Sequence, residues 1–245
     1  MTRHLLRAVG ACTCMLLVAL SGCSSDSDDA TTDRPVTASQ TSEPEPEPEQ
    51  ATDAEVTLAV EVRPEDLPRG FGTTNQFGEK GDLVDGYVTL DVCGGTFPSE
   101  ALRTARHQVA FGARNGDSIS TETVAYEPGG ADQAMAELRS AIANCPRGFV
   151  NSSVEGQLDL KFRYEELPQE ADWQDGAVAV RVTITPSNRN GRSFPGALIY
   201  QTRGDVMTAA YVFAGAEKSG KLAARIASLL SKRLETASPG ATATS

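Results

Sequence analysis

Large apolar side chains are almost absent from residues 23–54, and this confines the folded core to the residues that follow. The segment consists mainly of Ser, Thr, Asp, Glu, Pro and Gln, which cannot offset the chain entropy lost on folding. Its prolines alternate with glutamates over residues 43–49, which favours an extended chain. We therefore expect residues 23–54 to form a disordered tether, residues 55–236 one domain, and residues 237–245 a disordered tail.

Negative charge is concentrated in the expected tether. Residues 23–54 carry nine acidic side chains against Arg34, a net charge of −8, whereas the chain from residue 23 onward carries −13. The expected domain therefore carries only −5. A nucleic-acid-binding protein would be expected to have a basic stripe, so the charge argues against a nucleic-acid partner.

The first 22 residues have the three-part layout of a secretory signal. Two arginines precede an apolar run, Val9–Leu20, which is too short to span a bilayer. The following Leu20-Ser21-Gly22-Cys23 resembles the bacterial lipobox, in which cleavage occurs before an acylated cysteine. This resemblance implies a signal peptide over residues 1–22 and a lipid, palmitate included, on Cys23. Because two or more acyl chains anchor a protein stably, we expect the domain on the outer face of the cell membrane. An ordinary signal peptide with an incidental cysteine is the alternative.

Beyond Cys23, the predicted mature chain contains only Cys93 and Cys145. An even pair in an exported protein predicts a disulfide. Closing a loop of about 50 residues would contribute about 4 kcal/mol on the chain-entropy model. A metal or redox pair is the alternative, but CxxC spacing is missing and His107 is the single histidine after residue 22. We expect no metal and no cofactor.

Apolar residues at helical spacing predict two helices, over residues 131–145 and 217–235. Asn115-Gly116-Asp117 and Arg203-Gly204-Asp205 each predict a hairpin turn. Alternating or apolar runs predict strands over residues 108–111, 119–126, 157–164, 177–185, 197–202 and 206–213. Adjacent hairpins favour antiparallel pairing, so we predict an α+β fold in which two helices cover one face of a sheet of about five to six strands.

Four stretches together resemble the actinobacterial sensor-domain lipoproteins, which are related to the extracellular sensor domain of the mycobacterial kinase PknH. They are DLPRGF (66–71), DVCGGTFPSE (91–100), ISTETVAYEPGGADQAMAELRSAIANCP (119–146) and LIYQTRGDVMTAAYVF (198–213). The resemblance covers residues 60–235 and implies an extracellular domain that binds an unidentified ligand in a cleft. The kinase version usually has two disulfides, whereas this chain offers one pair. It also has no kinase segment, so any signal would pass through a partner.

The motifs that could support catalysis are weak. His107 lies among arginines, with no carboxylate nearby in the sequence, and we expect a surface or rim position beside a hairpin rather than a catalytic role. Residues 191–196 (GRSFPG) depart from the G-x-S-x-G elbow of hydrolases, since the second glycine is one residue late and a strand follows. We expect a loop there and no catalytic residue.

An acidic run over residues 165–175 surrounds Trp173, the single tryptophan of the chain. The run lacks the spacing and the central glycine of an EF-hand, so a solvated loop is expected. Trp173 is the candidate ligand contact, because tryptophan is enriched at binding hot spots. Packing against the sheet is the alternative role.

These observations lead to one functional hypothesis and two alternatives. The expected function is a non-enzymatic, membrane-anchored sensor or ligand-binding lipoprotein, whose partner is a small ligand or an envelope protein. A carrier of lipid or glycolipid between membrane and wall is the first alternative, and it would need a large apolar cavity. An extracytoplasmic hydrolase that uses His107 is the second.

Overall fold

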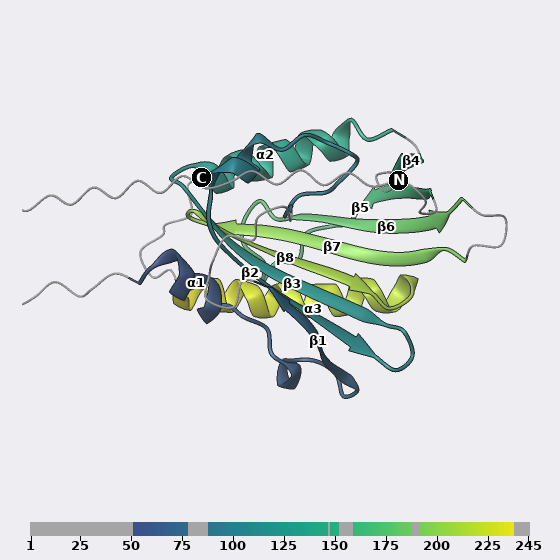
Figure 1. Ribbon diagram of the computed structural model, residues 1–245, viewed down its shortest axis with the longest axis horizontal. Coiled ribbons are helices and arrows are strands. Elements are labelled where there is room, and N and C mark those ends of the chain that lie inside the picture. The colour runs from purple at the N-terminus through teal and green to yellow at the C-terminus, as the bar shows by residue number, and fades with distance from the viewer. Residues whose placement is uncertain (1–50, 78–87, 147, 152–158, 188–191, 238–245) are drawn as a thin grey trace, which may run out of the picture. The chain divides into compact units, whose positions relative to one another are not determined.

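The computed structural model describes residues 51–77, 88–146, 148–151, 159–187 and 192–237. The expected signal peptide, Cys23, the tail and all but the end of the expected tether lie outside these residues. The described residues form an α+β fold with one antiparallel sheet and three α-helices (Figure 1), which confirms the predicted fold class. No helix in this part of the chain is long and apolar enough to cross a membrane.

The sheet has eight strands, in the order β1-β2-β3-β8-β7-β6-β5-β4, rather than the five to six predicted. Each strand is antiparallel to its neighbours, and pairing of β3 with β8 joins strands β1–β3 to strands β4–β7 in one sheet. The additional strands are β1 and the three-residue β4, whose short or polar sequences lack a clear alternating pattern. The strands are β1 Phe71–Phe77, β2 Arg103–Ala113, β3 Ser118–Tyr126, β4 Phe149–Asn151, β5 Leu160–Glu166, β6 Val178–Pro186, β7 Phe194–Arg203 and β8 Val206–Phe213.

Both predicted helices are present, as α2 (Gly130–Ala143) and α3 (Ala216–Ala237). A third helix, α1 (Asp53–Ala59), starts two residues before the expected domain boundary. Its start is capped reciprocally: the Glu55 amide donates to Thr52 Oγ1, and the Thr52 amide donates to the Glu55 carboxylate. The hydrogen bond from Thr52 lowers the pKa of Glu55. Two short 3₁₀ helices, Pro64–Asp66 and Pro98–Leu102, complete the fold.

The helices cover both faces of the sheet, not one face as predicted (Figure 1). Side chains alternate along β8, so that Val206, Ala210 and Val212 pack in the core with α3, while Met207 and Ala209 pack in the core with α2. Because α1 also packs on the α3 side, we call the two surfaces of the sheet the α3 face and the α2 face. The strand pattern is consistent with this arrangement, since both sides of β8 are buried.

Candidate functional site

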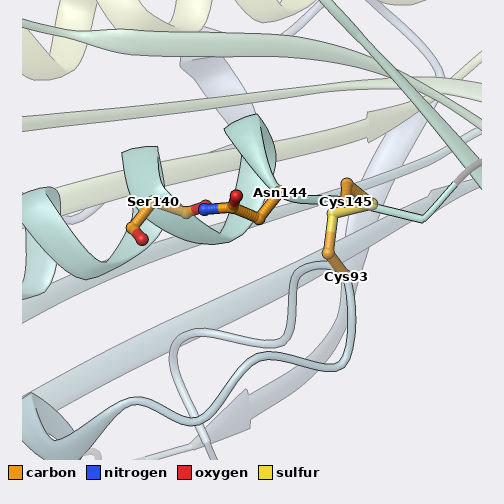
Figure 2. Close-up of a disulfide and its surroundings, with 4 residues drawn as sticks. All are labelled: Cys93, Ser140, Asn144 and Cys145. Atoms are coloured by element: carbon orange, nitrogen blue, oxygen red, sulfur yellow. A yellow bond between two sulfur atoms is a disulfide. The ribbon is translucent and has the colours of Figure 1, made fainter.

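A disulfide joins Cys93 and Cys145, as the pair of cysteines predicted (Figure 2). Their Cα atoms are 5.3 Å apart, and the bond ties the loop before β2 to the end of α2. The neighbouring Asn144 donates from Nδ2 to the carbonyl oxygen of Ser140, at 2.8 Å, and so closes the last turn of the helix. Cys93 has a φ of 58°, in the left-handed region that non-glycine residues seldom adopt.

Side-chain hydrogen bonds hold the same loop over the α2 face. The Ser99 hydroxyl donates to Oε2 of Glu137, on α2, at 2.7 Å. The Glu100 carboxylate accepts from the backbone amides of Thr89 and Leu90, at distances between 2.9 and 3.2 Å. The disulfide and these bonds together fix Thr89 against the middle of the sheet.

A buried ion pair lies under this loop. Arg106 of β2 and Glu122 of β3 are 1% and 2% exposed, and Nε of Arg106 donates to Oε1 of Glu122. Oγ1 of Thr89 donates to the same carboxylate oxygen at 2.6 Å. Arg106 also donates from Nη2 to Gln108, at 2.9 Å, while its buried Nη1 has no hydrogen-bond partner within the described residues. Removing two charges from water is costly, so this pair is weak evidence for a purely stabilising role.

Tyr211 of β8 extends the network across the sheet. Its hydroxyl donates to the Thr89 carbonyl oxygen at 2.9 Å and lies 3.3 Å from Oε2 of Glu122. Burial raises the pKa of both Tyr211 and Glu122, because it penalises their charged forms. For Glu122 the Arg106 charge and the Thr89 hydroxyl oppose this shift without reversing it. The Tyr211 ring packs edge to face against Tyr200, with centroids 5.7 Å apart.

A pocket of about 450 Å³ lies beside the network on the sheet, and we call it the sheet pocket. Small residues of β2 and β3 leave space for it, and the aromatic rings of β8 form one wall. Its lining includes Ala110, Gly112, Ser118, Ser120, Tyr211 and Phe213. Ser120 accepts from Nε2 of Gln108 at 3.0 Å, so two lining residues, Ser120 and Tyr211, connect the pocket to the buried ion pair. Pockets that bind small molecules commonly combine apolar walls with a few polar groups of this kind.

His107 is buried, not at the surface or rim as predicted. It is 2% exposed on the α3 face, and its Nε2 lies 2.9 Å from Oε2 of Glu61. Glu61 is 46 residues away, which is why no carboxylate was visible near His107 in the sequence. The Glu61 segment is in turn held by Arg233 of α3, which donates to the Glu61 carbonyl oxygen and to the carboxylate of Asp66.

Trp173 lies in the core on the α3 face and is only 7% exposed, in agreement with the packing alternative. The next residue, Gln174, donates from Nε2 to Oγ of Ser231 at 2.6 Å, which fixes the loop to α3. The acidic side chains around Trp173 do not form a metal site: within the described residues no group of three or more His, Cys, Asp or Glu side chains could hold an ion. Glu165 instead pairs with Arg163 and Arg181, and the Arg163 side chain lowers its pKa.

The two other motifs are ordinary structural elements. Gly204-Asp205 is the two-residue turn between β7 and β8, and Oδ1 of Asp205 accepts from the Gly129 amide at 2.7 Å. Phe194–Gly196 of the GRSFPG stretch lie in strand β7 and not in a loop as predicted, while Gly191 is outside the described residues. Ser193 is followed by a strand, not by the helix that follows the serine of a nucleophile elbow.

Sequence reasoning missed Arg106, Glu122 and Tyr211, which form the centre of the site. A charged residue at an alternating position of a strand usually faces solvent, and nothing local distinguishes Glu122 from such a residue. The one available signal was that Arg106 and Glu122 carry opposite charges on either side of a predicted hairpin turn. In the register of this hairpin Arg106 lies opposite Val124 and Gln108 lies opposite Glu122, so Arg106 and Glu122 are diagonal neighbours.

Comparison with known proteins finds a likeness among solved structures. No family model and no curated protein matches the chain. Among solved structures, the chain is similar to the crystal structure of the extracellular domain of PknH from Mycobacterium tuberculosis, with 13% sequence identity and a TM-score of 0.47. The match covers 75% of this chain and 98% of that chain.

Proposed function

We propose that this protein is a non-enzymatic ligand-binding domain, of the sensor type, held on the outer face of the cell membrane by a lipid on Cys23. The observation that carries the binding proposal is the sheet pocket. Its polar lining residues, Ser120 and Tyr211, are hydrogen-bonded to a buried Arg106–Glu122 network. A ligand that contacts these residues would therefore act on groups whose positions are set by the loop and the disulfide.

The chemistry of the pocket favours a small, uncharged ligand with hydroxyl or amide groups. The hydroxyl groups of Ser118 and Ser120 line the pocket, and the rings of Tyr211 and Phe213 supply apolar area. Asp117 is the charged residue that lines the pocket, and Lys218 compensates it. Ligands of this kind bind through a few directed hydrogen bonds and a large apolar contact.

The pocket proposal can be tested by native mass spectrometry of the full chain extracted from its own envelope in mild detergent. We expect a retained molecule on the wild type. Ala110→Leu adds bulk to the lining of the sheet pocket and should remove that molecule, whereas Ala101→Leu, at an exposed position outside the pocket, should retain it. A molecule that stays bound to folded Ala110→Leu would place the ligand elsewhere.

The anchor has an independent test. Cells grown with a fatty-acid analogue should label the wild type and leave Cys23→Ser unlabelled. Equal label on both proteins would contradict lipidation at Cys23 without affecting the proposal for the sheet pocket.

Neither alternative function gains an observation of its own. The buried position of His107 beside Glu61 supports a structural role for this histidine rather than proton transfer to a substrate. A lipid carrier would require a large enclosed apolar cavity, and the sheet pocket is an open hollow of about 450 Å³ with polar groups in its lining.

A further inference from the structure

A second hollow, of about 650 Å³, lies where the loop before β1, the β2–β3 turn and the start of α3 meet. It is positively charged although the expected domain carries −5 overall. Its cationic residues are Arg69, Arg114 and Lys218, and its acidic residue is Asp117. We call it the basic groove.

Two of the three cations have no partner among the residues that the structure describes. Lys218 donates to the Asp117 carboxylate and lowers the pKa of that group, so this pair is neutralised internally. Arg69 and Arg114 are exposed, and neither makes a hydrogen bond or an ion pair with the described residues. The groove therefore keeps a net charge of about +2 that a ligand could neutralise.

The remaining lining suits a ligand with both a ring and an anion. Pro68 and Phe71 supply apolar surface next to the two arginines, while Gly70 and Gly72 bring no side chain into the space. The planar guanidinium group can donate two parallel hydrogen bonds to the oxygens of one phosphate, which favours arginine for phosphate recognition. A phosphorylated sugar or polyol could place its ring on Phe71 and its phosphate between Arg69 and Arg114.

The groove lies far from the end of the domain at which the preceding chain enters. The Thr104 hydroxyl, at the start of β2, donates to Oδ2 of Asp53 in α1. Arg114 follows the last residue of the same eleven-residue strand, so Thr104 and Arg114 are about 35 Å apart at the usual rise per residue.

We propose that the basic groove is a binding site for a soluble phosphorylated sugar or polyol, separate from the sheet pocket.

Calorimetric titration of the full chain carrying Cys23→Ser, with glucose 1-phosphate and with glucose as the neutral control, tests this proposal. We expect binding of the phosphate ester and much weaker binding of glucose. Arg69→Gln with Arg114→Gln should weaken glucose 1-phosphate binding by about tenfold or more, because charge-assisted hydrogen bonds are lost. Replacing both arginines by lysine should restore part of the affinity, since the charge returns without the planar geometry.

The matched control is Arg63→Gln with Arg192→Gln, which removes two exposed charges that do not line the groove. This control should bind as the wild type does. Equal binding of glucose and glucose 1-phosphate, no binding of either, or equal weakening in both double variants would overturn the proposal. A second experiment compares binding to vesicles of phosphatidylinositol in phosphatidylcholine with binding to vesicles of pure phosphatidylcholine. Binding to the phosphatidylinositol vesicles that depends on the two arginines, without binding of glucose 1-phosphate, would assign the groove to a lipid headgroup and refute the soluble ligand.

Discussion

The Oγ1 atom of Thr89 donates a 2.6 Å hydrogen bond to Oε1 of Glu122, a residue 33 positions further along the chain. Thr89 belongs to the loop before β2, which the Cys93–Cys145 disulfide ties to the end of α2, and Glu122 lies in β3, in the middle of the sheet. This bond therefore connects the disulfide, the buried ion pair and the sheet pocket. Changes to any of these three features should be measurable in the other two.

Loss of the disulfide should destabilise the protein and loosen this loop. Because 52 residues separate the two cysteines, Cys93→Ser with Cys145→Ser should cost about 4 kcal/mol on the chain-entropy model. The melting temperature should fall by about 10 °C, and the amides of Thr89 and Leu90 should exchange hydrogen faster. Unchanged exchange at these two amides would show that the hydrogen bonds alone hold the loop.

Replacing Arg106 alone should be more harmful than replacing the whole ion pair. Arg106→Met leaves the Glu122 carboxylate buried without its cation, which costs about 3–5 kcal/mol. Arg106→Met with Glu122→Leu removes both charges and should cost less. Urea denaturation of the two single variants and the double variant measures the coupling, and additive losses would contradict it.

The raised pKa of Glu122 gives this residue a defined effect on pH stability. The folded protein keeps a proton that the unfolded chain, with an ordinary glutamate pKa of 4.5, releases earlier. The contribution of Glu122 is therefore fully present below that value and is lost as pH rises through the raised pKa of the folded state. Glu122→Gln should lack this loss when its free energy of unfolding is compared with the wild type from acidic to neutral pH. Parallel pH profiles of the two proteins would refute the assignment.

Gly196 should not tolerate a side chain. A Cβ atom there would lie 2.5 Å from the Phe213 ring and 2.9 Å from the Val212 carbonyl oxygen, so Gly196→Ala should cost about 1–3 kcal/mol. Gly72→Ala is the matched control in another strand, because its Cβ would meet no atom within 4 Å. Thermal unfolding compares the two, and equal melting temperatures would exclude close packing at Gly196.

His107→Ala should lower the free energy of unfolding, because His107 is buried and not at the surface. The substitution removes a buried side chain and its contact with Glu61, at a cost of about 1–3 kcal/mol. Chemical denaturation measures this loss, and protein abundance in cells should be recorded beside any phenotype. A variant with wild-type stability that behaves as a deletion would return the hydrolase alternative to first place.

Local patterns in the sequence determined helices α2 and α3, the two predicted hairpin turns and the disulfide pair of this protein. The apolar stripes of α2 and α3 repeat every three to four residues, and the turns at Asn115–Asp117 and Arg203–Asp205 contain the residues that hairpins require. The prediction of the disulfide needed only the number of cysteines that follow residue 23. In each case the information lies within one segment of the chain or in its composition.

Only the tertiary structure decided which helix covers which face, and which charges are buried. Both faces of β8 are apolar, so its sequence is compatible with helices on one side or on both. The partners Thr89 and Glu122 are separated by 33 residues, and His107 and Glu61 by 46. Whether such residues meet depends on strand order and register, and a shift of one residue would turn Glu122 to the opposite face of the sheet.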